Sequence, residues 1–231
     1  FILTNPYLLA ALLMVVGCAI CGNLAQTTYE KYLEISGLKG KRTPCEYILF
    51  KVKENLLTNI CCILTSLFVS GNIIRRFGWK ALAYMAPIIM LVIGTLFLGA
   101  SMLYQSNQTK WVYESIGLDG KSIMCSLGML QSIASIFAKY AFFDISKALV
   151  YTGMDVEVRT KGRGMINVIG SRLGKLLSSL IQIGALSLLS PEESIFDITW
   201  LLWLVFCCFG LLWILSIRYI GGILKKQNKI D

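Results

Sequence analysis

The sequence predicts an all-α polytopic membrane protein with six transmembrane helices, and three observations support this. Its 231 residues are 56% hydrophobic and 15% charged, with a mean hydropathy of +0.67. An ordinary soluble domain is about 45–50% apolar and about 25% charged. Long apolar runs alternate with short polar segments, which is typical of membrane spans. One apolar run carries the cations Arg172 and Lys175, which favours a helix that faces a cavity or a solute path.

The apolar runs place the helices at about 6–27, 49–74, 79–104, 122–143, 166–189 and 198–220, within a single transmembrane domain that covers 1–231. Residues 1–5 have no basic segment or cleavage site of a signal peptide. Six spans with both ends on one side have the form of one half of a twelve-helix transporter. We therefore expect the chain to be the C-terminal half of a longer protein, whose N-terminal six-helix half is its partner.

The distribution of Lys and Arg predicts the orientation. The turn at 71–80 with Arg75 and Arg76, the loop at 144–163 and the tail are basic, whereas the opposite connections are mixed, neutral or acidic. The positive-inside rule therefore places both termini in the cytoplasm or its equivalent. The net charge of +9 reflects either such loops or a cationic path for an anionic solute. In a membrane protein it does not indicate nucleic acid, and the lipid bilayer is the expected surrounding.

Polar side chains recur on the first two helices. Asn23 and Gln26 share a face near the end of the first helix, which is either an interfacial end or a surface that faces a cavity. The second helix has a weak polar stripe, made of Lys51, Asn55, Thr58, Cys62 and Thr65.

The fourth helix has a comparable face that ends in a cation. Its members are Gly128, Gln131, Ser132, Ser135 and Lys139. Polar contacts between helices are one interpretation, and a cavity lining is the other.

The fifth helix is the most informative. At about 100° per residue, its polar residues fall on one narrow face, and these are Asn167, Ser171, Gly174, Lys175, Ser178 and Gln182. A cation near the bilayer core costs about 2.5–3.5 kcal/mol, so we interpret this as one wet, cationic stripe. A polar run, which includes Asp155, Glu157, Lys161 and Arg163, precedes it.

Neither a metal site nor an enzyme is predicted. Seven of the eight cysteines lie in apolar runs, the chain has no histidine, and no second ligand pair accompanies Cys18 and Cys21. There is no P-loop and no paired carboxylate motif. No cofactor is expected, and the chain is predicted not to be an enzyme.

Two motifs resemble known transporters. The turn GNIIRRFGWK at 71–80 resembles the turn between the second and third helices of each half of major facilitator transporters. The segment KGRGMINVIGSRLGKLLSSLIQ at 161–182, with NPYLL near the start, resembles the ATP/ADP translocases of plastids and obligate intracellular parasites. The residues that match this family pattern most closely include Lys139, Tyr140, Phe143, Asp144, Lys147, Tyr151, Asp155, Glu157, Lys161, Gly162, Gly170, Ser171, Arg172, Gly174, Lys175 and Gln182.

The chain also departs from that pattern. Asn167 replaces an aspartate, Ala148 a glutamate, and Gln26 a glutamate, while Glu30 replaces a lysine. The resemblance covers the whole chain as the second six-helix half.

The resemblance implies nucleotide transport, with ATP and ADP as solutes and alternating access around a central site. We expect the phosphates to contact Lys175 and Arg172, because arginine can pair two oxygens at once. The other candidate binding residues are Asn167, Ser171, Gln182, Lys139, Gln26 and Asn23, and the candidate gating residues are Asp144, Lys147, Asp155, Glu157, Lys161, Arg163, Arg75 and Arg76.

Two alternatives remain open: proton-coupled import of other nucleotides or NAD, and a non-transporting paralogue. The expected membrane is the plasma membrane of an intracellular parasite or bacterium, or a plastid envelope.

Overall fold

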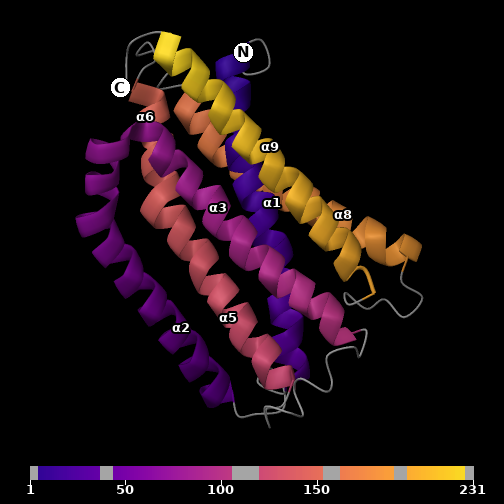
Figure 1. Cartoon of the computed structure of the whole chain (residues 1–231). Coiled ribbons are helices and arrows are strands. Elements are labelled where there is room, and N and C mark those ends of the chain that lie inside the picture. The colour runs from indigo at the N-terminus through magenta and orange to yellow at the C-terminus, as the bar shows by residue number, and fades with distance from the viewer. Residues whose placement is uncertain (1–4, 37–43, 106–119, 153–161, 190–196, 227–231) are drawn as a thin grey trace.

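The computed structural model of the chain describes residues 5–36, 44–105, 120–152, 162–189 and 197–226, and these are all-helical, with no strand (Figure 1). The predicted all-α fold class is therefore confirmed. The elements are α1 (Pro6–Ile35), α2 (Pro44–Thr65), η1 (Ser66–Ser70), α3 (Gly71–Gln105), α5 (Gly120–Ala138), η2 (Lys139–Phe143), α6 (Asp144–Thr152), η3 (Ile166–Gly170), α8 (Ser171–Leu189) and α9 (Thr199–Lys226). The three η segments are π-helical and continue into their neighbours without a break.

Four of the described helices are long and apolar enough to cross a membrane: Pro6–Ile35, Gly71–Tyr104, Gly162–Leu189 and Thr199–Leu224. The chain is thus a multi-pass integral membrane protein, with four of the six expected spans meeting these criteria. The helix α2 is less apolar because a single turn of it contains three charged residues, Lys51, Lys53 and Glu54.

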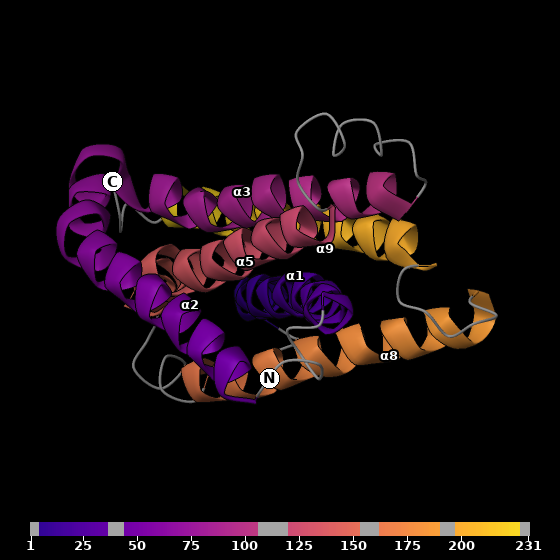
Figure 2. The ribbon, with the colours of Figure 1, turned by 90° about the horizontal axis from the view of Figure 1, so that it is seen from below.

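The helix α1 lies at the centre of the bundle (Figure 2). It packs against α9, α5 and α8, while α3 packs against α5 and α9. The two remaining long helices lie at the margins, where α8 packs mainly on α1 and α2 packs mainly on α5. The start of α1 and the end of α9 lie at the same end of the bundle (Figure 1).

The first helix is longer than predicted. Asn5 caps it by accepting a hydrogen bond from the Tyr7 backbone N–H at 3.1 Å, and Pro6 occupies the first turn. We placed its end near residue 27, where the sequence becomes polar, but the helix continues to Ile35. Tyr29, Tyr32 and Leu33 are buried there, and the ring of Tyr32 lies edge-on to Phe97, with 6.1 Å between the centroids. Packing of these apolar groups outweighs the polar surface of the same turns.

The predicted turn at 71–80 is also corrected. Helical backbone continues past Arg75 and Arg76, and the direction changes at Gly78, where φ is 75° and ψ is 179°. Only glycine adopts this conformation readily. Trp79, the next residue, is buried and donates from Nε1 to the carbonyl oxygen of Ser146 at 2.8 Å, which anchors the start of the following helix to α6.

The segment after residue 143 was predicted as a loop or a short amphipathic helix. Its first part, Asp144–Thr152, is helical and continues directly from η2. Helical structure resumes at Gly162, before the predicted start at 166. Three predicted gating residues, Asp155, Glu157 and Lys161, lie outside the described residues.

Candidate functional site: a cationic pocket between α1, α2, α5 and α8

A cavity of about 610 Å³ lies between α1, α2, the α5–η2–α6 stretch and the η3–α8 stretch. Its apolar wall includes Val15, Met90 and Phe143. Its polar lining consists of Asn23, Gln26, Lys51, Glu54, Asn55, Ser132, Ser135, Lys139, Asp144, Lys147, Asn167, Ser171 and Lys175. The central helix therefore contributes amides, and the surrounding helices contribute the charges.

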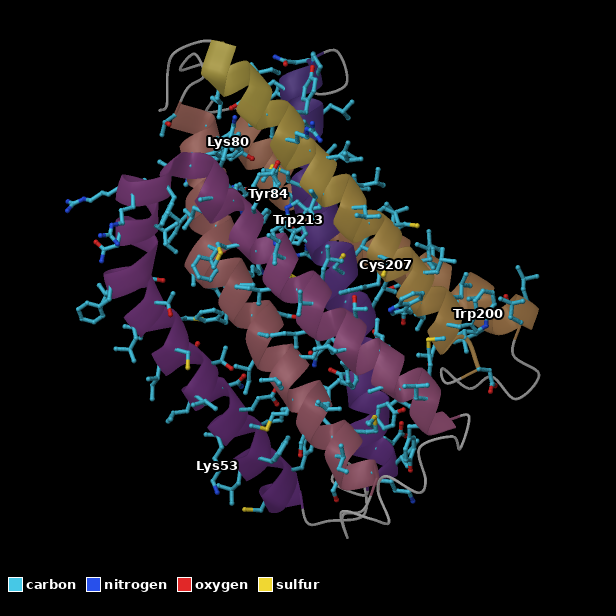
Figure 3. The ribbon with its side chains drawn as sticks, viewed as in Figure 1. Lys53, Lys80, Tyr84, Trp200, Cys207 and Trp213 are labelled. Carbon is cyan, nitrogen blue, oxygen red and sulfur yellow. The ribbon has the colours of Figure 1, made fainter. Side chains whose placement is uncertain are left out.

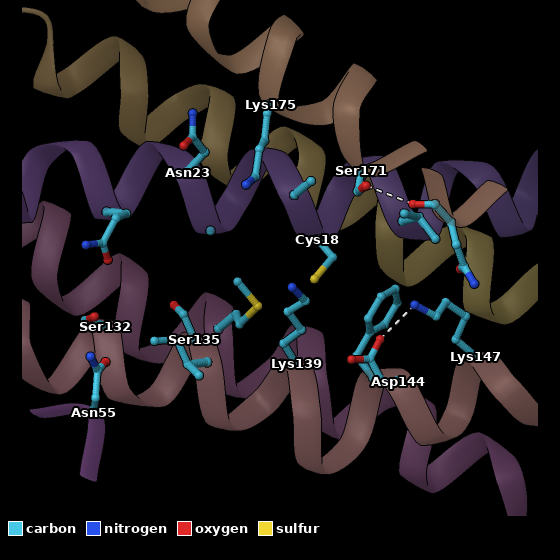
Figure 4. Close-up of a pocket in the computed structure, with 18 of the residues that line it drawn as sticks. Cys18, Asn23, Asn55, Ser132, Ser135, Lys139, Asp144, Lys147, Ser171 and Lys175 are labelled. Carbon is cyan, nitrogen blue, oxygen red and sulfur yellow. Dashed lines mark hydrogen bonds and ion pairs between the residues drawn. The ribbon is translucent and has the colours of Figure 1, made fainter. Parts of the chain in front are cut away.

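The charges in this lining are four lysines and two carboxylates. Lys147 pairs with Asp144 at 2.7 Å, and Lys51 pairs with Glu54 at 2.9 Å. Among the described residues no carboxylate pairs with Lys139 or Lys175. These two side chains extend into the pocket from opposite sides in Figure 4. The pocket thus has an excess of positive charge carried by two unpaired ammonium groups.

Close contact between α8 and α1 places Lys175 in the pocket. Glycines at 170 and 174 face α1, so the two backbones approach closely, as small residues allow in membrane helices. A β-carbon built on Gly174 would lie 2.6 Å from the Ala19 β-carbon and 2.9 Å from the Val16 carbonyl oxygen. Asn23 then donates to the Ser178 hydroxyl at 2.6 Å. This contact fixes the position of Gly174 on α1, and the exposed side chain of the next residue, Lys175, lines the pocket.

Hydrogen-bonding groups surround these cations. The Ser171 hydroxyl donates to the Asn167 carbonyl oxygen at 2.8 Å. The Asn167 side-chain oxygen is buried and accepts no hydrogen bond from the described residues. Gln26 donates to Glu30 at 3.2 Å, so the two positions that depart from the family pattern on α1 contact each other. Asn167 therefore brings a buried acceptor, without a partner among the described residues, to the wall of the cavity.

Eight of the thirteen predicted site residues that the structure describes are brought together in this pocket. Those that line it are Lys175, Asn167, Ser171, Lys139, Gln26, Asn23, Asp144 and Lys147. Arg172 and Lys175 are both exposed, but Arg172 does not line the pocket, because it lies about 100° around the helix from Ser171. Gln182 is buried in the α1–α8 contact, where it donates to the Ser178 hydroxyl at 3.2 Å. Arg75, Arg76 and Arg163 are exposed and lie outside the lining.

Two parts of the lining were not selected from the sequence as binding residues. The first is Lys51, Glu54 and Asn55 on α2, and the second is Ser132 and Ser135 on α5. Their signals were present as the weak polar stripe of the second helix and the polar face of the fourth. Glu54 was not recognised, although its spacing of three residues from Lys51 allows an ion pair on one helix.

The arrangement suits an anion with additional hydrogen-bonding groups. Unpaired ammonium groups in a partly closed cavity attract phosphate or carboxylate oxygens, and amides and hydroxyls can orient an uncharged part. The described residues contain no group of three His, Cys, Asp or Glu side chains that could hold a metal ion. These features define a multi-pass membrane protein with a solute-sized cationic pocket.

The comparison with known families identifies the class more closely. A model of the TLC ATP/ADP transporter family matches residues 1–223. The chain belongs to this family, which confirms the resemblance seen in the sequence. It is a family of transporters, which confirms the prediction that the chain is not an enzyme.

Individual relatives also support this family assignment. The ADP,ATP carrier protein 1 of Chlamydia trachomatis is 34% identical over 186 residues, which cover 80% of this chain and 34% of the relative. The ADP,ATP carrier protein 4 of Rickettsia bellii is 29% identical over 212 residues, which cover 92% of this chain and 40% of the relative. The chain therefore spans about a third to two fifths of the relatives' length. No solved structure matches it.

Proposed function

We propose that this chain forms part of a nucleotide transporter that exchanges ATP and ADP. The observation that carries the proposal is the pair of unpaired cations, Lys139 and Lys175, at opposite sides of one cavity. The names of the relatives, ADP,ATP carrier proteins, supply the solute class. Phosphate oxygens would contact the two ammonium groups, and the amides of Asn23, Gln26 and Asn167 would contact the uncharged part.

The proposed mechanism is alternating access, in which two six-helix halves rock around a site near the bilayer midplane. The described residues are consistent with one such half, since the polar pocket lies beside the central helix α1. The partner would be the N-terminal half of the same protein. Asp144 and Lys147, which form an ion pair at the edge of the pocket, are the gating candidates that line it.

A counter-exchange assay tests this function. The complete protein that carries this chain is expressed in bacterial cells, which take up labelled ATP and are then chased with unlabelled ADP. Exchange predicts rapid efflux of the label. Lys175→Gln should weaken uptake about tenfold to a hundredfold, because a hydrogen bond to a charged group contributes about 1.5–3 kcal/mol. Lys53→Gln is the matched control, since Lys53 is exposed on α2 and points away from the bundle (Figure 3).

The outcomes separate the alternatives. If the cells take up labelled ATP but unlabelled ADP causes no efflux of the label, the transport mode is net import and not exchange. Loss of uptake in Arg172→Gln, with Lys175→Gln unchanged, would contradict the pocket as the binding site. No nucleotide uptake, with the protein verified in the membrane, would overturn the proposed function and favour another solute or a non-transporting relative.

A further inference from the structure

A second lysine of the pocket is held by a buried acid on α2. Lys51 and Glu54 form an ion pair at 2.9 Å, and the Tyr29 hydroxyl of α1 donates to the same carboxylate oxygen at 3.2 Å. The Lys51 ammonium also lies 4.7 Å from the centroid of the Tyr29 ring. We refer to Lys51, Glu54 and Tyr29 as the α2 triad. It connects α2, which packs mainly on α5, directly to the central helix.

The two charged members of the triad differ in accessibility. The side chain of Glu54 is 2% exposed, whereas that of Lys51 is 24% exposed. A buried carboxylate is stable only when it is paired and hydrogen-bonded, and Lys51 and Tyr29 supply these contacts. Both charged residues line the cavity, but the more accessible of the two is the cation.

The ammonium group also retains unused donors. A lysine carries three N–H donors, and one of them is directed to Glu54. The described residues supply no other hydrogen-bond acceptor to Lys51. Because the Tyr29 ring and Glu54 fix the end of the side chain from two sides, the remaining donors are available to an anion in the cavity.

We propose that Lys51 is a further anion-binding residue of the pocket, held in position by Glu54 and Tyr29. This rests on the proposed nucleotide transport. Lys51 contacts a phosphate from the α2 wall, while Lys175 and Lys139 contact phosphates from α8 and η2. Three cations on three walls favour a solute with several phosphates, because a monophosphate has fewer oxygens to share among them. Glu54 neutralises Lys51, so the pair adds no net charge to the pocket and Lys51 acts through its remaining N–H donors. The α2 triad therefore contributes to discrimination by the number of phosphates.

The test compares binding of ATP, ADP and AMP to the purified complete protein in detergent. Lys51→Gln should weaken ATP binding at least about tenfold, the effect of losing one charge-assisted hydrogen bond, and weaken AMP binding much less. Glu54→Gln should strengthen ATP binding, because the amide keeps a contact to Tyr29 while the pocket gains one uncompensated positive charge. The control is Lys53→Gln, because Lys53 lies next to Glu54 in the sequence but is exposed. This variant should bind all three nucleotides as the unmodified protein does.

A double variant separates direct contact from net charge and from folding. Lys51→Gln with Glu54→Gln removes the buried ion pair as a whole, so neither charge is left unpaired and the net charge of the pocket is unchanged. Weak binding of ATP, with near-normal binding of AMP, supports the proposal. ATP binding equal to that of the unmodified protein overturns it. Equal losses for ATP and AMP in Lys51→Gln also overturn it, since a merely structural contact between α1 and α2 would affect both alike.

Lys175→Gln, measured in parallel, keeps the two proposals distinguishable. If it weakens nucleotide binding while the Lys51 variants do not, the role of the α2 triad is wrong and the proposed function stands. If the unmodified protein binds no nucleotide, both proposals fall.

Discussion

Replacement of Gly174 by alanine tests the contact that places Lys175 in the pocket. The added β-carbon would lie 2.6 Å from that of Ala19 and 2.9 Å from the Val16 carbonyl oxygen. Carbon atoms in contact are normally about 3.5–4.0 Å apart. Since the Val16 oxygen belongs to the backbone and cannot rotate away, α8 must move from α1 by about 1 Å.

The expected change in unfolding free energy is the sum of two opposing effects. Insertion of a methyl group into a packed interface costs about 1–3 kcal/mol, whereas alanine in place of glycine favours a helix by up to about 1 kcal/mol. Gly184 lies on the same helix, and a β-carbon added there would have no other atom within 4 Å. Gly184→Ala should therefore change the unfolding free energy only through helix propensity. The difference in unfolding free energy between the two variants should therefore equal the packing term, about 1–3 kcal/mol.

The assay is thermal unfolding of the complete protein in detergent, followed by ADP binding to the folded fraction. Gly174→Ala should melt below Gly184→Ala, by at most about 2–4 °C for each kcal/mol, which is the shift for a chain of about 150–250 residues and becomes smaller in a longer protein. ADP binding should weaken in Gly174→Ala alone, since Lys175 moves with α8. A Gly174→Ala protein at least as stable as Gly184→Ala would refute the close α1–α8 contact.

Two further predictions concern buried polar groups. Trp79→Phe should lower the unfolding free energy by about 0.5–1.5 kcal/mol, because it removes the buried hydrogen bond that Nε1 donates to the Ser146 carbonyl oxygen. Trp200→Phe should have no such effect, because Trp200 is 47% exposed at the outer surface of α9 (Figure 3). Equal melting temperatures of the two variants would contradict this. In variants that retain a single cysteine, an anionic methanethiosulfonate should modify Cys18, which lines the cationic pocket, faster than a cationic reagent of similar size, and ATP should slow the reaction. Both thiols are buried, with Cys18 6% and Cys21 1% exposed, but Cys21 does not line the pocket and donates to the Phe206 carbonyl oxygen at 3.6 Å. Cys21 is therefore the control, and equal labelling of the two thiols would argue against the pocket lining.

Much of the fold could be predicted because its signals are local. Apolar runs located the helices, and the polar face of the fifth helix led to Lys175. Helix ends were less predictable, because they depend on packing between distant segments. Tyr32 extends α1 through its contact with Phe97, and no pattern near residue 27 reports that contact. The single-residue bend at Gly78 likewise depends on Trp79 reaching Ser146.

Only part of the site could be predicted, again because contacts between distant segments leave no local signal in the sequence. Arg172 and Lys175 are both cations in an apolar run, and composition alone cannot distinguish them. The orientation of the helix decides, because Gly174 against α1 turns Lys175 toward the cavity and Arg172 away from it. The acid Glu54 was missed because its stabilising partner Tyr29 lies on another helix, and that proximity exists only in the folded chain.

The pairing of charges in the pocket gives a physical reason for its composition. A cation that loses contact with water carries a desolvation penalty unless it is paired, and the two less exposed lysines of the pocket, Lys51 and Lys147, are the ones that have a carboxylate partner. Glu54 and Asp144 neutralise these two, whereas the unpaired Lys139 and Lys175 are exposed and lie on different helices. A multivalent anion can contact the unpaired lysines and the remaining N–H donors of the paired ones, so the pocket gains attractive contacts on binding although two of its four lysines are already neutralised by carboxylates. Weaker discrimination between ATP and AMP in the Lys51 variants is the direct consequence of this arrangement.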